Sequence, residues 1–186
     1  MSKALDRLLH YSPYIAGVVT LLIFVAFEHT LQDQLKLVSL GLESLVNIAF
    51  SYILKRIIRQ PRPHSQEYGF PSAHSMFWAG YCVSVYISWG ISLQFVLVLI
   101  ILAGVCAQRV VSGYHTPDQV LYGVIFGGFL AVAWDFLMQF TNYGLIKPLL
   151  EVYYKALADM FSETKDEEIV PKEPEHAQPP EEQLFM

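Results

Sequence analysis

Five apolar runs constrain the fold of this chain more than any other feature of its sequence. They cover residues 14–27, 37–54, 75–89, 92–111 and 119–140, and short polar connections separate them. A helix needs about 20 mostly apolar residues to cross a bilayer. The composition agrees, because 54% of the residues are apolar and only 16% are charged, against about 25% charged in soluble domains. The sequence therefore predicts an all-α, multispanning membrane helix bundle with about five spans.

The chain becomes less apolar after the fifth run. Residues 145–161 mix Leu, Tyr and Phe with charged side chains, which favours a helix lying at the membrane surface, with a sixth, short span as the alternative. Residues 162–186 hold four prolines and eight acidic residues against two lysines. A segment of that composition cannot bury enough apolar surface to fold. We therefore predict a membrane-embedded domain over residues 1–161 and a disordered acidic tail over residues 162–186.

The charge distribution narrows the class of protein. The chain carries a formal charge of −5, but this charge lies in the predicted tail, and the membrane domain is close to neutral. A nucleic-acid binder would instead show a basic patch, so no nucleic-acid partner is predicted. The two cysteines, Cys82 and Cys106, lie inside apolar runs and have no metal-ligand spacing.

The order of the runs brings two polar connections to one face of the membrane. If the second run ends near residue 54, the connection 55–74 lies on one face. The third and fourth runs cross the bilayer and return, so the connection 109–118 lies on that same face. We expect the active site to be formed by these two connections. Basic residues with a role in binding would also gather there, so charge alone does not orient the chain.

The first connection begins with a basic cluster. Lys55 and Arg59 have the i,i+4 spacing that places two side chains on one face of a helix. Arg62 stands between two prolines, which predicts an extended backbone. The side chains could reach lipid headgroups at the end of a span. Alternatively, a Lys point charge and a planar Arg fork could bind different oxygens of one phosphate.

The same connection ends in a predicted helix start. Pro71 and Ser72 favour the first turn of a helix, whose free N–H groups form an anion site. His74 would lie in this first turn and face a bound anion. The structural alternative is a plain helix cap with a histidine at the membrane interface.

The second connection carries Arg109 and His115. Thr116, a following proline and Gln119 form a capping box at the start of the fifth run, so His115 stands immediately outside a helix N-terminus. The two connections together bring one Lys, two Arg, one Ser and two His to one face. Phosphoryl transfer requires such a set, because cations neutralise the phosphoryl oxygens while two histidines act as nucleophile and acid.

These residues resemble the three signature motifs of the type 2 phosphatidic acid phosphatase superfamily in order and spacing. The motifs are Lys55, six residues and Arg62-Pro63; Pro71-Ser72-x-His74; and Arg109, five residues and His115. Within that superfamily, residues 68–75 and 114–123 are similar to the dolichyl diphosphate phosphatases. The resemblance covers about residues 55–139.

The resemblance implies a role for each matching residue. His115 would attack phosphorus and become phosphohistidine, and His74 would protonate the departing lipid phosphate. The transferring group would be held by Lys55, Arg62, Ser72 and Arg109. The superfamily works without a metal, which agrees with the lack of a carboxylate cluster in the two connections, so no cofactor is expected.

One departure concerns the group that orients His115. The superfamily usually has an Asp four positions after this histidine, where this chain has Gln119, with Asp118 one residue earlier. The dolichyl diphosphate branch resembles this chain in carrying Gln there, so the change does not imply inactivity. Both Gln119 and Asp118 are candidates for the orienting group. Gln108 also departs from the pattern, since a Ser often precedes the motif's Arg.

The resemblance implies hydrolysis of dolichyl diphosphate to dolichyl phosphate and inorganic phosphate, which supports dolichol recycling for protein N-glycosylation. It also implies residence in the endoplasmic reticulum membrane with the active site facing the lumen. The alternative is the same chemistry on phosphatidate or another lipid phosphate. A silent lipid-binding scaffold is a third hypothesis, which the intact histidine pair disfavours. The motifs leave Arg56 and Arg59 unassigned, and both are candidates to bind the extra oxygens of a polyisoprenoid diphosphate. Arg59 is the candidate contact chosen for the second phosphate.

Overall fold

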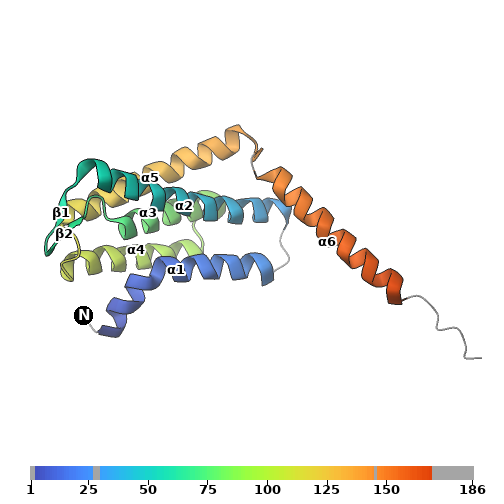
Figure 1. The fold of residues 1–186 in the computed structure, drawn as a ribbon, viewed down its shortest axis with the longest axis horizontal. Helices are drawn as coiled ribbons and strands as arrows, with labels where there is room; N and C mark the ends of the chain where they lie inside the picture. The colour runs from blue at the N-terminus through green and yellow to red at the C-terminus, as the bar shows by residue number, and fades with distance from the viewer. Residues whose placement is uncertain (1–2, 27–29, 145, 169–186) are drawn as a thin grey trace, which may run out of the picture. The chain divides into compact units, whose positions relative to one another are not determined.

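The computed structural model describes residues 3–26, 30–144 and 146–168 (Figure 1). These residues form six helices and one two-stranded antiparallel hairpin. The elements are α1 (Lys3–Ala26), α2 (Leu31–Ile58), β1 (Pro61–Arg62), β2 (Ser65–Tyr68), α3 (Ala73–Trp89), α4 (Leu93–Val111), α5 (Pro117–Phe140) and α6 (Lys147–Glu168). The chain divides into two compact units, Met1–Lys147 and Pro148–Met186. The site described below lies in the first unit.

Helices α1 to α5 correspond to the five predicted apolar runs. By length and composition, three helices of the described residues could cross a membrane, namely α2, α4 and α5. α3 has only 17 residues, so the predicted count of about five spans is approximate. The prediction of an all-α, multispanning bundle is confirmed.

Three helices extend well beyond the segments predicted for them, and one of these is α2, which covers Leu31–Ile58 where the predicted run is 37–54. α1 begins at Lys3, well before residue 14, because the preceding residues favour a helix and Asp6 stands in the first turn. α6 ends at Glu168 and therefore includes residues 162–168, which composition assigns to the tail. These seven residues contain no proline or glycine that would end a helix. The rest of the predicted tail, 169–186, lies outside the described residues.

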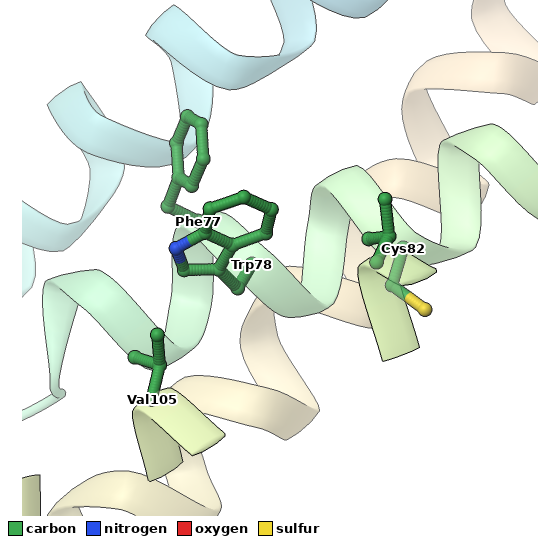
Figure 2. Packing of buried hydrophobic residues seen from close by; sticks show 5 residues of the cluster. Phe77, Trp78, Cys82 and Val105 are labelled. Atoms are coloured by element: carbon green, nitrogen blue, oxygen red, sulfur yellow. The ribbon is translucent and has the colours of Figure 1, made fainter. Parts of the chain in front are cut away.

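α3 packs against α2, α4 and α5. A buried cluster joins it to α4 and consists of Phe77, Trp78, Cys82, Val98 and Val105 (Figure 2). The indole N–H of Trp78 donates a hydrogen bond to the Ser12 hydroxyl of α1 at 2.9 Å. α3 therefore contacts helices that precede it in the sequence and helices that follow it.

α3 and α5 meet backbone to backbone. Gly123 and Gly127 lie one turn apart on α5 and face Ser72 and Met76 of α3. A Cβ atom at Gly123 would lie 2.7 Å from the Ser72 carbonyl oxygen, and one at Gly127 would overlap the Met76 carbonyl. Glycine at both positions therefore permits the close approach of the two helices. This contact lies next to the starts of α3 and α5, where the site is built.

Candidate active site

The three motifs meet at one end of the first unit, where α2 and α4 end and α3 and α5 begin (Figure 1). Lys55 Nζ donates to the Pro71 carbonyl at 2.8 Å. The backbone N–H of Ser72 donates to the Gln119 carbonyl at 2.8 Å, and Gln119 Nε2 donates to the Pro61 carbonyl at 2.9 Å. The two predicted connections therefore form one site, together with the hairpin.

His115 is buried between α4 and α5, with 5% of its surface exposed. Its Nδ1 lies 2.9 Å from Gln119 Oε1. The Pro61 carbonyl only accepts hydrogen bonds, so the Gln119 NH₂ group must face Pro61 and its oxygen must face His115. An oxygen there accepts from Nδ1–H, which leaves the lone pair of the neutral ring on Nε2. The predicted capping box between Thr116 and Gln119 is present in both directions and holds the same glutamine.

The surroundings of His115 keep its imidazole neutral. Burial lowers the pKa of His115 to about 3, although the hydrogen bond to Gln119 acts in the opposite direction. Lys55, Arg62 and Arg109 lower the pKa further by repelling a protonated ring. A neutral ring with a free Nε2 lone pair can act as a nucleophile.

His74 occupies the first turn of α3, as the motif spacing predicts. Its Nε2 lies 2.9 Å from the backbone carbonyl oxygen of His10 in α1. A carbonyl can only accept, so Nε2 carries a proton and Nδ1 is left to face a ligand. Nearby Ser72 is fully buried, and its hydroxyl accepts from Ser75 Oγ at 3.0 Å and does not cap the helix. Its own hydroxyl proton can therefore go to a ligand.

Two guanidinium groups, those of Arg62 and Arg109, have a buried Nε donor without an acceptor in the described part of the chain. Arg109 is 3% exposed, and its Nε has no hydrogen-bond partner among the described residues; the same holds for Nε of Arg62. Arg62 Nη1 pairs with Glu67 Oε2 of the hairpin at 2.9 Å. Buried donors without partners are rare in proteins and call for a ligand. An anion such as phosphate is the ligand that both groups fit.

The hairpin over residues 61–68 was not predicted, although Arg62 is extended as expected. Arg62 lines two cavities beside it. One, of about 400 Å³, is also lined by Lys55, Arg56 and Glu67, among others. The other, of about 330 Å³, lies between the hairpin and the α4–α5 connection and includes Tyr114.

The expectation that Arg59 shares a helical face with Lys55 is not met by the structure. α2 ends at Ile58, and Arg59 is its C-cap in the left-handed conformation, with φ 55°. The helical repeat therefore stops before Arg59, which does not share the face of Lys55. Its Nε donates to the Arg56 carbonyl at 3.1 Å, and the side chain is exposed. Arg56 takes its place at the cavity wall, where it donates to the Tyr52 hydroxyl.

The two candidates for orienting His115 are separated by the structure. Gln119 is completely buried and contacts the ring. Asp118 is exposed in the first turn of α5. The observed contact therefore involves Gln119, the residue four positions after the histidine.

Contacts from α1 were not predicted. Asp6 accepts hydrogen bonds from Gln108, Ser112 and Tyr114, and His10 contacts His74. The i,i+4 spacing of Asp6 and His10 on one helix face was the available signal, but it does not identify a partner. Within the described part of the chain, no group of three or more His, Cys, Asp or Glu side chains is placed to hold a metal ion.

The chain matches the PAP2 superfamily over residues 36–143. Its relatives include Dolichyldiphosphatase 1 of Callithrix jacchus, which is 35% identical in an alignment of 148 positions that covers 67% of this chain and 59% of that protein. Dolichyldiphosphatase 1 of Homo sapiens is 34% identical with the same coverage. The Dolichyldiphosphatase of Saccharomyces cerevisiae is 34% identical in an alignment of 129 positions, which covers 56% of this chain and 51% of the yeast protein.

The chain thus spans 51% to 59% of the length of these curated relatives. No solved structure matches it significantly. The superfamily match covers more than half of the chain and includes all three motifs. The chain therefore belongs to the PAP2 superfamily.

Proposed function

We propose that this chain hydrolyses a lipid diphosphate, and specifically dolichyl diphosphate to dolichyl phosphate and inorganic phosphate. The observation that carries the proposal is His115, a buried neutral imidazole whose Nε2 is free and which lies among three cations. The choice of dolichyl diphosphate is supported by the relatives, which are named dolichyldiphosphatases. Phosphatidate or another lipid phosphate is the alternative substrate.

The proposed reaction has two steps. Nε2 of His115 attacks the terminal phosphorus, so that a P–N bond forms while the P–O bond to the lipid phosphate breaks. His74 binds a second proton on Nδ1 beside the anionic substrate, and it donates this Nδ1 proton to the departing oxygen while Nε2–H stays on the His10 carbonyl. A water molecule then attacks the phosphohistidine with His74 as base, the P–N bond breaks, and inorganic phosphate leaves. During both steps the negative charge that develops on the phosphoryl oxygens is stabilised by Lys55, Arg62, Ser72 and Arg109.

The neutral amide of Gln119 suits this sequence of steps. With phosphate on Nε2 and a proton on Nδ1, the phosphorylated ring of His115 is cationic. An amide oxygen stabilises that cation less than a carboxylate would. The imidazole of His115 is therefore a better leaving group when water attacks the phosphohistidine in the second step.

The second phosphate of the substrate has a proposed place in the cavity of about 400 Å³. Lys55 and Arg62 connect this cavity to the site, and Arg56 adds a third cation there. Glu67 lines it as well, so a bound diphosphate has to compete with Glu67 for Arg62. A monophosphate headgroup would not need Arg56.

The experiment that tests the function is phosphate release by the purified full chain in detergent. Dolichyl diphosphate, undecaprenyl diphosphate and phosphatidate form the panel. Dolichyl diphosphate should have a higher kcat/KM than phosphatidate by about tenfold or more, the effect of one charge-assisted contact. Equal efficiency on the two would favour the alternative substrate class. Binding of the lipids without release of phosphate would favour the scaffold.

The cellular setting is part of the same proposal. We place the chain in the endoplasmic reticulum membrane with the site facing the lumen, where dolichyl phosphate is recycled for N-glycosylation. A Gln66→Cys variant would test the orientation, because residue 66 is exposed in the hairpin. An impermeant maleimide should label it in sealed microsomes only after the membrane is opened. Labelling of intact microsomes would place the site on the cytosolic face.

A further inference from the structure

α1 lies outside the superfamily match, which begins at residue 36, yet its first turns reach the site. α1 packs against α4, the helix that ends with Arg109. Asp6 and His10 are four residues apart and lie on the same face of α1. One contacts the α4–α5 connection, and the other contacts His74.

The carboxylate of Asp6 accepts three side-chain hydrogen bonds. Its Oδ1 accepts from Gln108 Nε2 at 2.8 Å and from Ser112 Oγ at 3.1 Å. Its Oδ2 accepts from the Tyr114 hydroxyl at 3.2 Å. All three donors belong to the short segment that also carries Arg109 and ends next to His115. One side chain of α1 therefore holds this segment at three points.

Tyr114 links Asp6 to the anion-binding groups. The Arg109 guanidinium carbon lies 4.9 Å from the centre of the Tyr114 ring, a cation–π distance. Arg109 has no carboxylate within salt-bridge distance among the described residues. The ring of Tyr114 is thus a principal support for the guanidinium, and the hydroxyl of that ring is held by Asp6. In addition, the backbone N–H of His115 donates to the backbone carbonyl of Arg109 at 3.0 Å.

We propose that Asp6 is a positioning residue for phosphoryl transfer, acting through Tyr114 on Arg109. This inference rests on the proposed function of the site. The carboxylate of Asp6 accepts from three neutral donors and lies beyond salt-bridge distance of Arg109. The positive charge of Arg109 stays available for the transferring phosphoryl group, while its place is fixed from α1.

The contact of His10 gives α1 a second hold on the site. The His10 carbonyl accepts from His74 Nε2 at 2.9 Å, and the two imidazole rings are 5.5 Å apart. α1 thereby supports both His74, the proposed acid, and Arg109, the cation held through Tyr114. A chain that lacked these first turns would keep all three motifs but lose both supports.

The test compares Asp6→Ala, Tyr114→Phe and the double variant in the full chain. Tyr114→Phe keeps the ring under Arg109 and removes only the hydroxyl. Asp6→Ala should lower kcat for dolichyl diphosphate by about tenfold or more while KM changes less than about twofold, because Arg109 acts mainly in the transition state. The double variant should be no slower than Asp6→Ala within about twofold, since both changes break one connection. Arg7→Ala, on an exposed neighbour in α1, is the matched control and should keep wild-type kcat.

Two further measurements separate positioning from folding. Vanadate inhibition should weaken about tenfold in Asp6→Ala, with thermal unfolding midpoints reported beside it. Asp6→Asn keeps an acceptor for Gln108 and Ser112, and its NH₂ group can donate to the Tyr114 hydroxyl, so the link to Tyr114 is kept. This variant should therefore lie closer to wild type than Asp6→Ala does. Additive losses in the double variant, a rise in KM alone, or Asp6→Asn as slow as Asp6→Ala would each overturn the proposal.

The wild-type chain separates failure of this proposal from failure of the proposed function. If wild type releases no phosphate from any lipid diphosphate, the proposed function fails. Vanadate binding, followed by tryptophan fluorescence, still reports on the phosphate site in that case. Equal vanadate affinity in wild type and Asp6→Ala would then refute the role of Asp6 by itself.

Discussion

Replacing Gln119 with alanine tests the geometry of the proposed nucleophile. The substitution removes the acceptor for His115 Nδ1 and the donor to the Pro61 carbonyl. It also removes one half of the capping box with Thr116. The His115 ring would then be free to turn or to change tautomer, and an Nε2 that carries a proton cannot attack phosphorus.

The expected size of the effect follows from these contacts. Loss of a carboxylate orienter from a serine-protease triad lowers kcat by about 10⁴, and a neutral amide stabilises the charged ring less. We therefore expect Gln119→Ala to lower kcat by about 10- to 100-fold, or about 1.4–2.7 kcal/mol. The lost hydrogen bonds and cap should also lower the free energy of unfolding by roughly 1–3 kcal/mol.

The assay pairs Gln119→Ala with Asp118→Ala. Asp118 is exposed and its interaction with the helix dipole is worth about 0.3–1 kcal/mol, so its removal should change kcat by less than about twofold. Phosphate release and thermal unfolding are measured on the same preparations. The orienting role of Gln119 is refuted if Asp118→Ala is the slower variant at an unchanged unfolding midpoint. It is also refuted if the loss in Gln119→Ala equals the fraction unfolded at the assay temperature.

Four other outcomes are expected. His115→Ala should abolish turnover in a folded protein, whereas His74→Ala should let a phosphoenzyme accumulate; ³²P-labelled protein from the His115→Ala variant would contradict the assignment. Burial and neighbouring cations lower the pKa of His115 to about 3, so its imidazole NMR signal should not titrate between about pH 5 and 8. The free energy of unfolding should fall as the pH drops below about 6.5, because the unfolded chain then binds a proton at His115 that the folded protein does not. Activity should survive EDTA, because side-chain cations neutralise the phosphoryl oxygens; loss restored by magnesium would count against this. Arg56→Ala should reduce the preference for diphosphate over monophosphate lipids by about tenfold, whereas Arg59→Ala should leave that ratio nearly unchanged, and the reverse order would return the second phosphate to Arg59.

Some parts of the site follow from local chemistry and could be predicted. The capping box at Thr116 needs only residues within one turn, and the extended backbone at Arg62 follows from its flanking prolines. Arg59 shows where local reasoning fails, because a helical face exists only while the helix continues, and α2 ends one residue earlier. The contact of Asp6 with Gln108 joins positions 102 residues apart. No periodicity in either segment encodes such a pair, since it arises only when α1 packs on α4.

Gly123 and Gly127 of α5 fix the distance between the two helices that carry the proposed catalytic histidines. Ser72 and His74 belong to the start of α3, and Gln119, which holds His115, belongs to the start of α5. Since Gly123 and Gly127 let these two helices touch along their backbones, there is no flexible side chain between them that could yield. A methyl group added at Gly127 would clash with the Met76 backbone of α3 and push α3 and α5 apart. The distance between the proposed proton donor, His74, and the proposed nucleophile, His115, would then increase. Two glycines that do not contact the substrate therefore set the distance between the two histidines.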